Sequence, residues 1–192
     1  MANTNRPNGA VPVGTINGSP YSGYVRRYAV DSSNGTAIFR GDFITLEDDG
    51  NVAPAAAGGI LLGVCVGVEV NRAVAATEHP GYLPASTAGY VLVAVGPDVL
   101  YEVQEDSVGG AMPLASVGSV GDMVAGAGST TTGRSAHVLD SSDVIAKDAA
   151  PGSAQLLVVG LVDRPDNEGA ANYARWIVKI NESAFALGQS GL

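Results

Sequence analysis

Hydrophobic and polar residues alternate with a period of two in many short stretches of this chain. Near the C-terminus, Trp176, Val178 and Ile180 fall on one face of such a stretch. Arg175 and Lys179 fall on the other face, as expected for a strand that is buried on one side only. Further apolar, β-branched runs occupy 24–30, 36–39, 42–47, 51–53, 60–70, 89–95, 99–104, 120–125, 134–140 and 155–163. This pattern predicts an all-β fold of the barrel or sandwich kind.

Turn residues between these runs predict two hairpins. The pair Asn34-Gly35 separates the runs 24–30 and 36–39, and this dipeptide is a strong hairpin signal. The tripeptide Asp48-Asp49-Gly50 separates the runs 42–47 and 51–53 in the same way. Helical signals are scarce. The best candidate is 142–149, which Pro151 and Gly152 would end.

The N-terminal residues differ in composition from the rest of the chain. Residues 1–23 contain three prolines and four glycines, which predicts an extended N-terminal arm without its own core, either free or lying on a partner. Residues 24–192 form the expected β-rich domain. A weak internal similarity, opened by Gly41-Asp42 and again by Gly121-Asp122, is compatible with two related modules, 24–115 and 116–192. A single barrel is the other interpretation, and the sequence leaves both open.

Charge and composition exclude several function classes. The 192 residues include 19 acidic and 10 basic side chains, which gives a net charge of −9, so binding to nucleic acid is not expected. The single cysteine, Cys65, excludes an intrachain disulfide and a cysteine metal cage. The longest apolar run ends at Glu69, too early for a membrane span. The N-terminus has no apolar stretch typical of a secretory signal, so we expect synthesis in the host cytoplasm.

No motif of a known catalytic class occurs in the sequence. Phosphate-binding glycine loops, nucleophile elbows and zinc-protease helices are absent. His137 stands close in sequence to Asp140 and Ser141, but such near neighbours on a strand project differently and rarely form a triad. The acidic groups at 47–49, 102–106 and 163–168 match no calcium loop. We therefore expect no enzyme activity, no cofactor and no metal.

Three stretches resemble the decoration, or cement, proteins of tailed bacteriophage capsids. They are Asn5–Gly14, Thr36–Asp42, and Gly160–Glu168 together with Trp176–Glu182. The resemblance implies a β-barrel or β-tulip-like subunit that forms a homotrimer on the exterior of the virion. Such a trimer would bind the major capsid protein and join neighbouring capsomers against the pressure of packaged DNA.

The resemblance also implies contact residues. Those expected on the arm are Arg6, Pro7, Val11, Pro12 and Val13. Arg26 and Arg27 follow as anchors for acidic groups on the capsid, or else as exposed side chains of an edge strand. The turn 163–167 is either a subunit contact or only a tight turn. The alternative function is a host-surface or glycan-binding β-domain displayed on a virion; such sites use exposed aromatic side chains, of which this chain has few.

Overall fold

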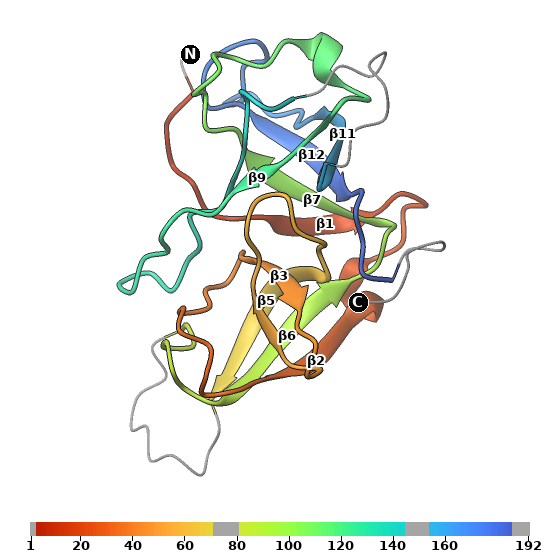
Figure 1. Ribbon diagram of the computed structural model, residues 1–192. Coiled ribbons are helices and arrows are strands. Elements are labelled where there is room, and N and C mark those ends of the chain that lie inside the picture. Colours follow the sequence, from red (N-terminus) through yellow and green to blue (C-terminus); the bar gives the residue numbers. More distant parts are fainter. Residues whose placement is uncertain (1–2, 71–80, 145–153, 186–192) are drawn as a thin grey trace.

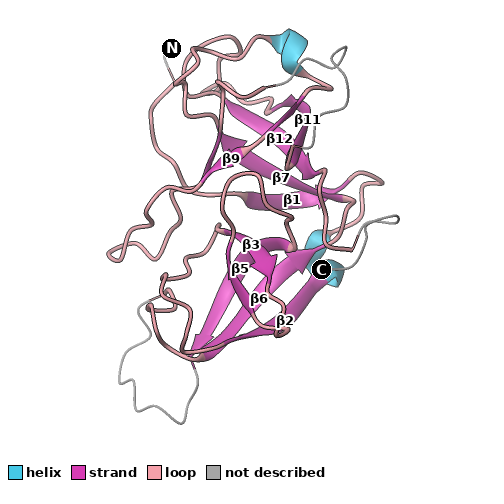
Figure 2. Ribbon diagram, in the orientation of Figure 1, coloured by secondary structure: helices cyan, strands magenta, loops and turns pink. Residues whose placement is uncertain are grey.

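In a computed structural model, the chain folds into three antiparallel sheets (Figure 1). The structure describes residues 3–70, 81–144 and 154–185. The strands are β1 (Val11–Thr15), β2 (Val25–Val30), β3 (Phe43–Leu46), β4 (Val52–Pro54), β5 (Gly63–Val70), β6 (Gly89–Val95), β7 (Val99–Gln104), β8 (Val120–Gly121), β9 (Met123–Val124), β10 (Val138–Leu139), β11 (Leu156–Leu161) and β12 (Arg175–Ile180). Two short 3-10 turns, η1 (Tyr21–Tyr24) and η2 (Leu114–Ser116), are the helical elements within these residues (Figure 2). The all-β prediction is confirmed.

Two five-stranded sheets form the body of the molecule. The first sheet has the order β2-β6-β5-β3-β4, and the second has the order β1-β7-β12-β11-β8. The third sheet is the pair β9–β10. Figure 1 shows the second sheet above the first along the long direction of the molecule. Neither five-stranded sheet closes into a barrel within the described residues.

The larger apolar core joins the two sheets. It combines Phe43 and Ala94 of the first sheet with Tyr101 and Trp176 of the second. The rings of Phe43 and Tyr101 meet edge to face with centroids 6.4 Å apart. The Tyr101 hydroxyl donates a hydrogen bond of 2.9 Å to the carbonyl of Ala94. Buried aromatic side chains of this kind contribute a large share of packing energy, so the two sheets are fixed against each other.

One of the two predicted hairpins is present. β3 and β4 pair across the acidic turn as expected. The hairpin predicted between 24–30 and 36–39 is wrong, because β2 pairs with β6 and the second run makes only a bridge from Ile38 to Leu83. The carboxylate of Asp31 accepts the N–H groups of Ser33 and Asn34, which turns the chain away from β2. Of the predicted helix 142–149, the first three residues are not helical, and the others lie outside the described residues.

The two five-stranded sheets share one strand order. Residues 25–95 contribute the strands of the first sheet. The first of these strands lies beside the last, then come the penultimate strand and the second strand, which gives β2-β6-β5-β3. The strands of residues 99–180 follow the same order in the second sheet, as β7-β12-β11-β8. Each sheet also has a bulge in its penultimate strand, between Cys65 and Gly67 in β5 and between Val158 and Gly160 in β11.

A glycine turn in each sheet docks on the bulged strand in the same way. The N–H of Gly41 donates to the carbonyl of Cys65 at 2.8 Å, and the N–H of Gly118 donates to that of Val158 at 2.9 Å. Both glycines have positive φ angles, 96° and 88°, which favour glycine. The true counterpart of Gly41 is therefore Gly118, and not Gly121 as the sequence suggested.

The sheets divide the chain at a different place from the expected modules. β7 (Val99–Gln104) belongs to the second sheet, although the sequence boundary at residue 115 assigned it to the first module. β1, from the expected arm, also belongs to the second sheet.

Candidate functional site

The N-terminal segment runs along the edge of the second sheet. It is extended, as predicted, but β1 pairs with β7 of the same chain. Before β1, the backbone N–H of Arg6 donates to Gln104 Oε1 at 3.0 Å. The amide of Gln104 in turn donates to the carbonyl of Thr4 at 2.8 Å. The segment is thus fixed in position by hydrogen bonds from residues 4 to 15.

The expected arm residues differ in exposure. Pro12 is buried opposite Tyr101, and Val11 is half-buried opposite Glu102. The register of β1 shifts between Pro12 and Gly14, so Val13 is the extra residue of a bulge. Bulges re-aim side chains, and Val13 is 48% exposed. With Arg6 and Pro7, which are also exposed, three of the five residues are available for a partner.

A cluster of charged side chains lies beside Arg6. Glu102 binds two guanidinium groups, that of Arg164 at 3.1 Å and that of Arg175 at 3.3 Å. The Arg175 guanidinium also donates to the backbone carbonyl of Arg6 at 3.0 Å. Arg6, Arg164 and Arg175 line a hollow of about 240 Å³. The sequence does not reveal this cluster, because its pattern shows only that Arg175 lies on the outward face of its strand.

The turn at 163–167 has a structural role in this arrangement. The side chain of Asn167 donates to the carbonyls of Val162 and Arg175, and its Oδ1 accepts the Arg175 N–H at 2.8 Å. These bonds close the connection between β11 and β12. The tight turn that the sequence suggested as one of two alternatives is therefore present.

Arg26 and Arg27 lie on the first sheet, apart from the N-terminal segment. Both are exposed side chains of β2, an edge strand. The guanidinium of Arg26 donates to the carbonyls of Gly23 and Val25, each at 3.0 Å. The guanidinium of Arg27 lies 3.5 Å from the ring centroid of Tyr90 and forms an ion pair with Glu69 at 3.1 Å. The structure therefore does not bring these two arginines together with Arg6.

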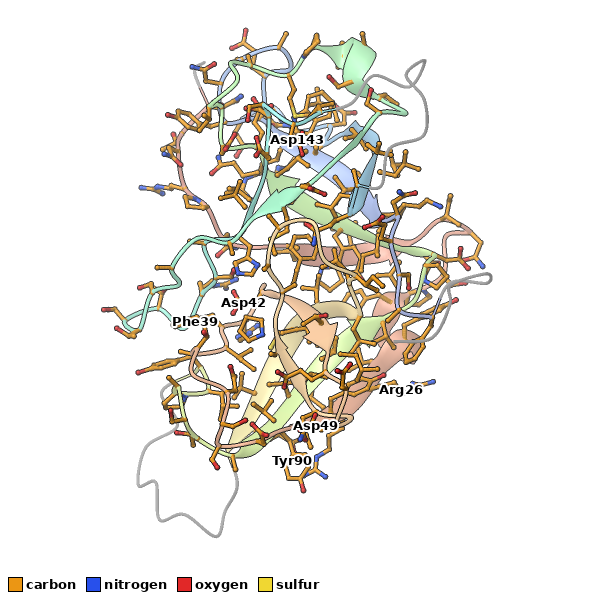
Figure 3. All side chains as sticks on the ribbon, in the orientation of Figure 1. Arg26, Phe39, Asp42, Asp49, Tyr90 and Asp143 are labelled. Atoms are coloured by element: carbon orange, nitrogen blue, oxygen red, sulfur yellow. The ribbon has the colours of Figure 1, made fainter. Side chains whose placement is uncertain are left out.

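A buried pair, Asp42 and His137, was not predicted. The Nε2 atom of His137 lies 3.4 Å from Asp42 Oδ1, and both side chains are nearly inaccessible. The N–H of Phe43 donates to Nδ1 of the same ring at 3.2 Å. Asp42 also accepts the N–H of Phe39 at 2.7 Å. Figure 3 labels Asp42 and Phe39, which lie close together between the two sheets.

This geometry does not form a catalytic triad. The carboxylate of Asp140 bonds to Ser142 instead, and the hydroxyl of Ser141 bonds to Asp106. Both ring nitrogens of His137 face partners, so neither is free to act as a general base. Burial lowers the pKa of His137, against the opposing effect of Asp42. Burial also raises the pKa of Asp42. A hollow of about 570 Å³, lined mainly by alanine and glycine, adjoins the pair.

The remaining candidate groups take structural positions. Asp49 accepts hydrogen bonds from Asn51 at the hairpin turn. The buried carboxylate of Glu105 accepts the N–H of Met112 at 3.1 Å and the indole N–H of Trp176 at 3.3 Å. In the described part of the chain, no three His, Cys, Asp or Glu side chains are grouped to hold a metal ion. No helix within the same residues is long and apolar enough to cross a membrane.

Comparisons with protein-family models, curated proteins and solved structures found no match.

On the geometry described above, the candidate site consists of the exposed residues of the N-terminal segment, the adjacent arginine cluster and the edge of β2. These surfaces present backbone groups, guanidinium groups and small apolar side chains. Such an arrangement can bind an acidic or extended protein surface.

Proposed function

We propose that this chain is a structural virion protein that binds the outer surface of a tailed-phage capsid. It acts as a homotrimer and joins neighbouring capsomers. The proposal combines the resemblance of three sequence stretches to capsid decoration proteins with the geometry of the N-terminal segment. A net charge of −9 disfavours contact with DNA. The partner that the resemblance implies, and that we propose, is the major capsid protein.

The observation that carries the proposal is the exposure of Arg6, Pro7 and Val13 on one extended segment. The backbone of this segment is already ordered by β7 and Gln104. An ordered segment loses less conformational entropy on binding than a free one. Three such segments in a trimer would bind one shell together, so that weak contacts add through a high effective concentration.

The experiment mixes the purified protein with expanded, DNA-free shells of the phage whose genome encodes it and then sediments the shells. We expect wild-type protein in the pellet and, by light scattering, a free particle of three 19.3 kDa chains. Substitution V13D places a charge at the proposed contact and should weaken binding at least roughly tenfold. The matched control is V108D, because Val108 is 78% exposed and lies in the turn after β7, which Asp106 and Ser141 hold, and not on β1.

A point substitution tests this role better than a deletion. Removal of residues 1–20 would also remove β1 and the buried side chain of Ala10, which would leave the edge of β7 unpaired. Wild-type protein that stays in the supernatant would contradict the proposal. Specific binding to a glycan array without binding to shells would support the alternative of a host-surface domain.

A further inference from the structure

We propose that the outer edge of β2, at Arg27–Ala29, binds an extended, carboxylate-bearing segment of the major capsid protein as an added antiparallel strand. This inference rests on the proposed function and names a second contact on the opposite sheet. It is carried by a comparison of the two five-stranded sheets. The edge that β1 covers in the second sheet has no hydrogen-bonded strand in the first, among the residues that the structure describes.

β2 and β7 hold equivalent positions in their sheets. Each pairs with the last strand of its sheet, β2 with β6 and β7 with β12. Both strands also end in the same turn. The carboxylate of Asp31 accepts the Ser33 N–H at 2.9 Å, and the carboxylate of Asp106 accepts the Val108 N–H at 3.0 Å. The equivalence therefore includes the strand ends as well as the strand order.

The registers make this equivalence exact for single residues. Arg26 stands opposite Val93, which also faces Cys65 at the bulge of β5. Tyr101 stands opposite the residue of β12 that faces the bulge of β11. Arg26 therefore corresponds to Tyr101.

The next residue of each strand identifies the open position. Arg27 corresponds to Glu102, and Glu102 is paired with Val11 of β1. In the first sheet, no described strand is hydrogen-bonded to β2 on that side, although β4 lies close to β2. β2 thus lacks the neighbour that its counterpart has.

The outward backbone groups of β2 are available for a strand. The N–H of Val25 donates to the carbonyl of Ser22 and so points away from β6. Because backbone direction alternates along a strand, Arg27 and Ala29 also direct their N–H and C=O groups away from β6. No described residue outside the sheet forms a backbone hydrogen bond with either of them. These four groups can bind an added strand.

Charge at this edge selects an acidic occupant. The guanidinium of Arg26 bonds only to the carbonyls of Gly23 and Val25, and no described carboxylate forms an ion pair with it. Figure 3 shows Arg26 at the margin of the molecule, directed away from the body. A carboxylate on the incoming strand would form a charge-assisted hydrogen bond with it. Pairing of β2 with β2 of a second copy would instead bring the arginines of both strands together, which is unfavourable.

The test compares two substitutions of one residue. A29P removes the outward N–H, and proline is tolerated where that N–H faces solvent on an edge strand. A29V keeps the N–H and serves as the matched control. We expect A29P to weaken sedimentation with expanded shells at least roughly tenfold, and A29V to bind as wild type. Light scattering and thermal unfolding of the free protein establish that both variants fold and assemble normally.

A second measurement does not depend on a variant. Hydrogen exchange of the wild-type protein on shells should slow at the amides of Arg27 and Ala29. Unchanged exchange there, or equal binding of A29P and A29V, would overturn the inference while wild-type sedimentation still supported the proposed function. Failure of the wild-type protein to sediment would overturn both. If R26A self-associates but still binds shells as wild type, Arg26 only blocks edge-to-edge association, and the proposal is overturned.

Discussion

The imidazole of His137 and the carboxylate of Asp42 face each other at 3.4 Å in a site that solvent hardly reaches. Asp42 directly precedes β3 of the first sheet, and His137 directly precedes β10. The same ring accepts the N–H of Phe43, the residue whose side chain also packs on Tyr101 of the second sheet. This pair is therefore a polar connection between the first sheet and the β9–β10 pair.

Removal of the imidazole should strongly destabilise the fold. H137A removes the imidazole from beside Asp42 Oδ1 and leaves the buried N–H of Phe43 without its acceptor, and one buried polar group left unsatisfied costs about 1–3 kcal/mol. The free energy of unfolding, measured by urea denaturation, gives the value. In a double-mutant cycle with D42A, we expect a coupling energy of at least about 1 kcal/mol. Additive losses would contradict the interaction.

The stability contributed by His137 should fall on acidification. Its pKa in the folded state is lowered by burial, so below about pH 6.5 the unfolded state binds the proton more readily. Asp42 has a raised pKa and acts in the opposite direction at lower pH, where its protonation removes a buried charge.

The two contributions can be separated with H137N. An asparagine amide can accept the Phe43 N–H but does not titrate. Between pH 7 and about pH 5.5 the wild-type protein should therefore lose more unfolding free energy than this variant. Parallel pH curves for the two proteins would show that His137 does not titrate on unfolding.

The docking turn at Gly41 should tolerate no side chain. Its φ angle is 96°, and a Cβ atom there would lie 2.8 Å from the carbonyl oxygen of Asn8. G41A should therefore cost at least about 1–2 kcal/mol of unfolding free energy. G35A is the control, because no atom lies within 4 Å of the position that its Cβ would take. Equal stability of the two variants would show that the turn at Gly41 relaxes freely.

The thiol of Cys65 should react only when the protein unfolds. It is 1% exposed, and burial raises its pKa to about 12. A maleimide at pH 8 should therefore label unfolded protein in urea within minutes and leave folded protein unlabelled. Rapid labelling of the folded protein would mean that β5 opens readily.

Local signals in the sequence predicted individual strands well and long-range pairing poorly. The acidic turn at 48–50 lies between its two strands, so turn chemistry alone specified β3–β4. The alternation in β12 likewise predicted that Trp176 is buried and Lys179 is not. The turn signal at Asn34-Gly35 led to the wrong hairpin prediction, because β2 pairs with β6, whose residues are distant from it in the sequence.

The candidate site was only partly predictable for the same reason. Prolines and glycines revealed an extended N-terminal segment, but nothing in residues 11–15 indicated that β7 would be their partner. Asp42 and His137 meet only because the β9–β10 pair packs against the first sheet. The open edge of β2 becomes visible only when the strand orders of both sheets are compared.

The most direct measurement is a reconstruction, by electron cryomicroscopy, of expanded shells incubated with the protein. The account predicts density for three copies at each site between capsomers, with Arg6 and Val13 against the shell and an added strand beside β2. Shells without such density, or copies attached through a face that contains none of these residues, would contradict it.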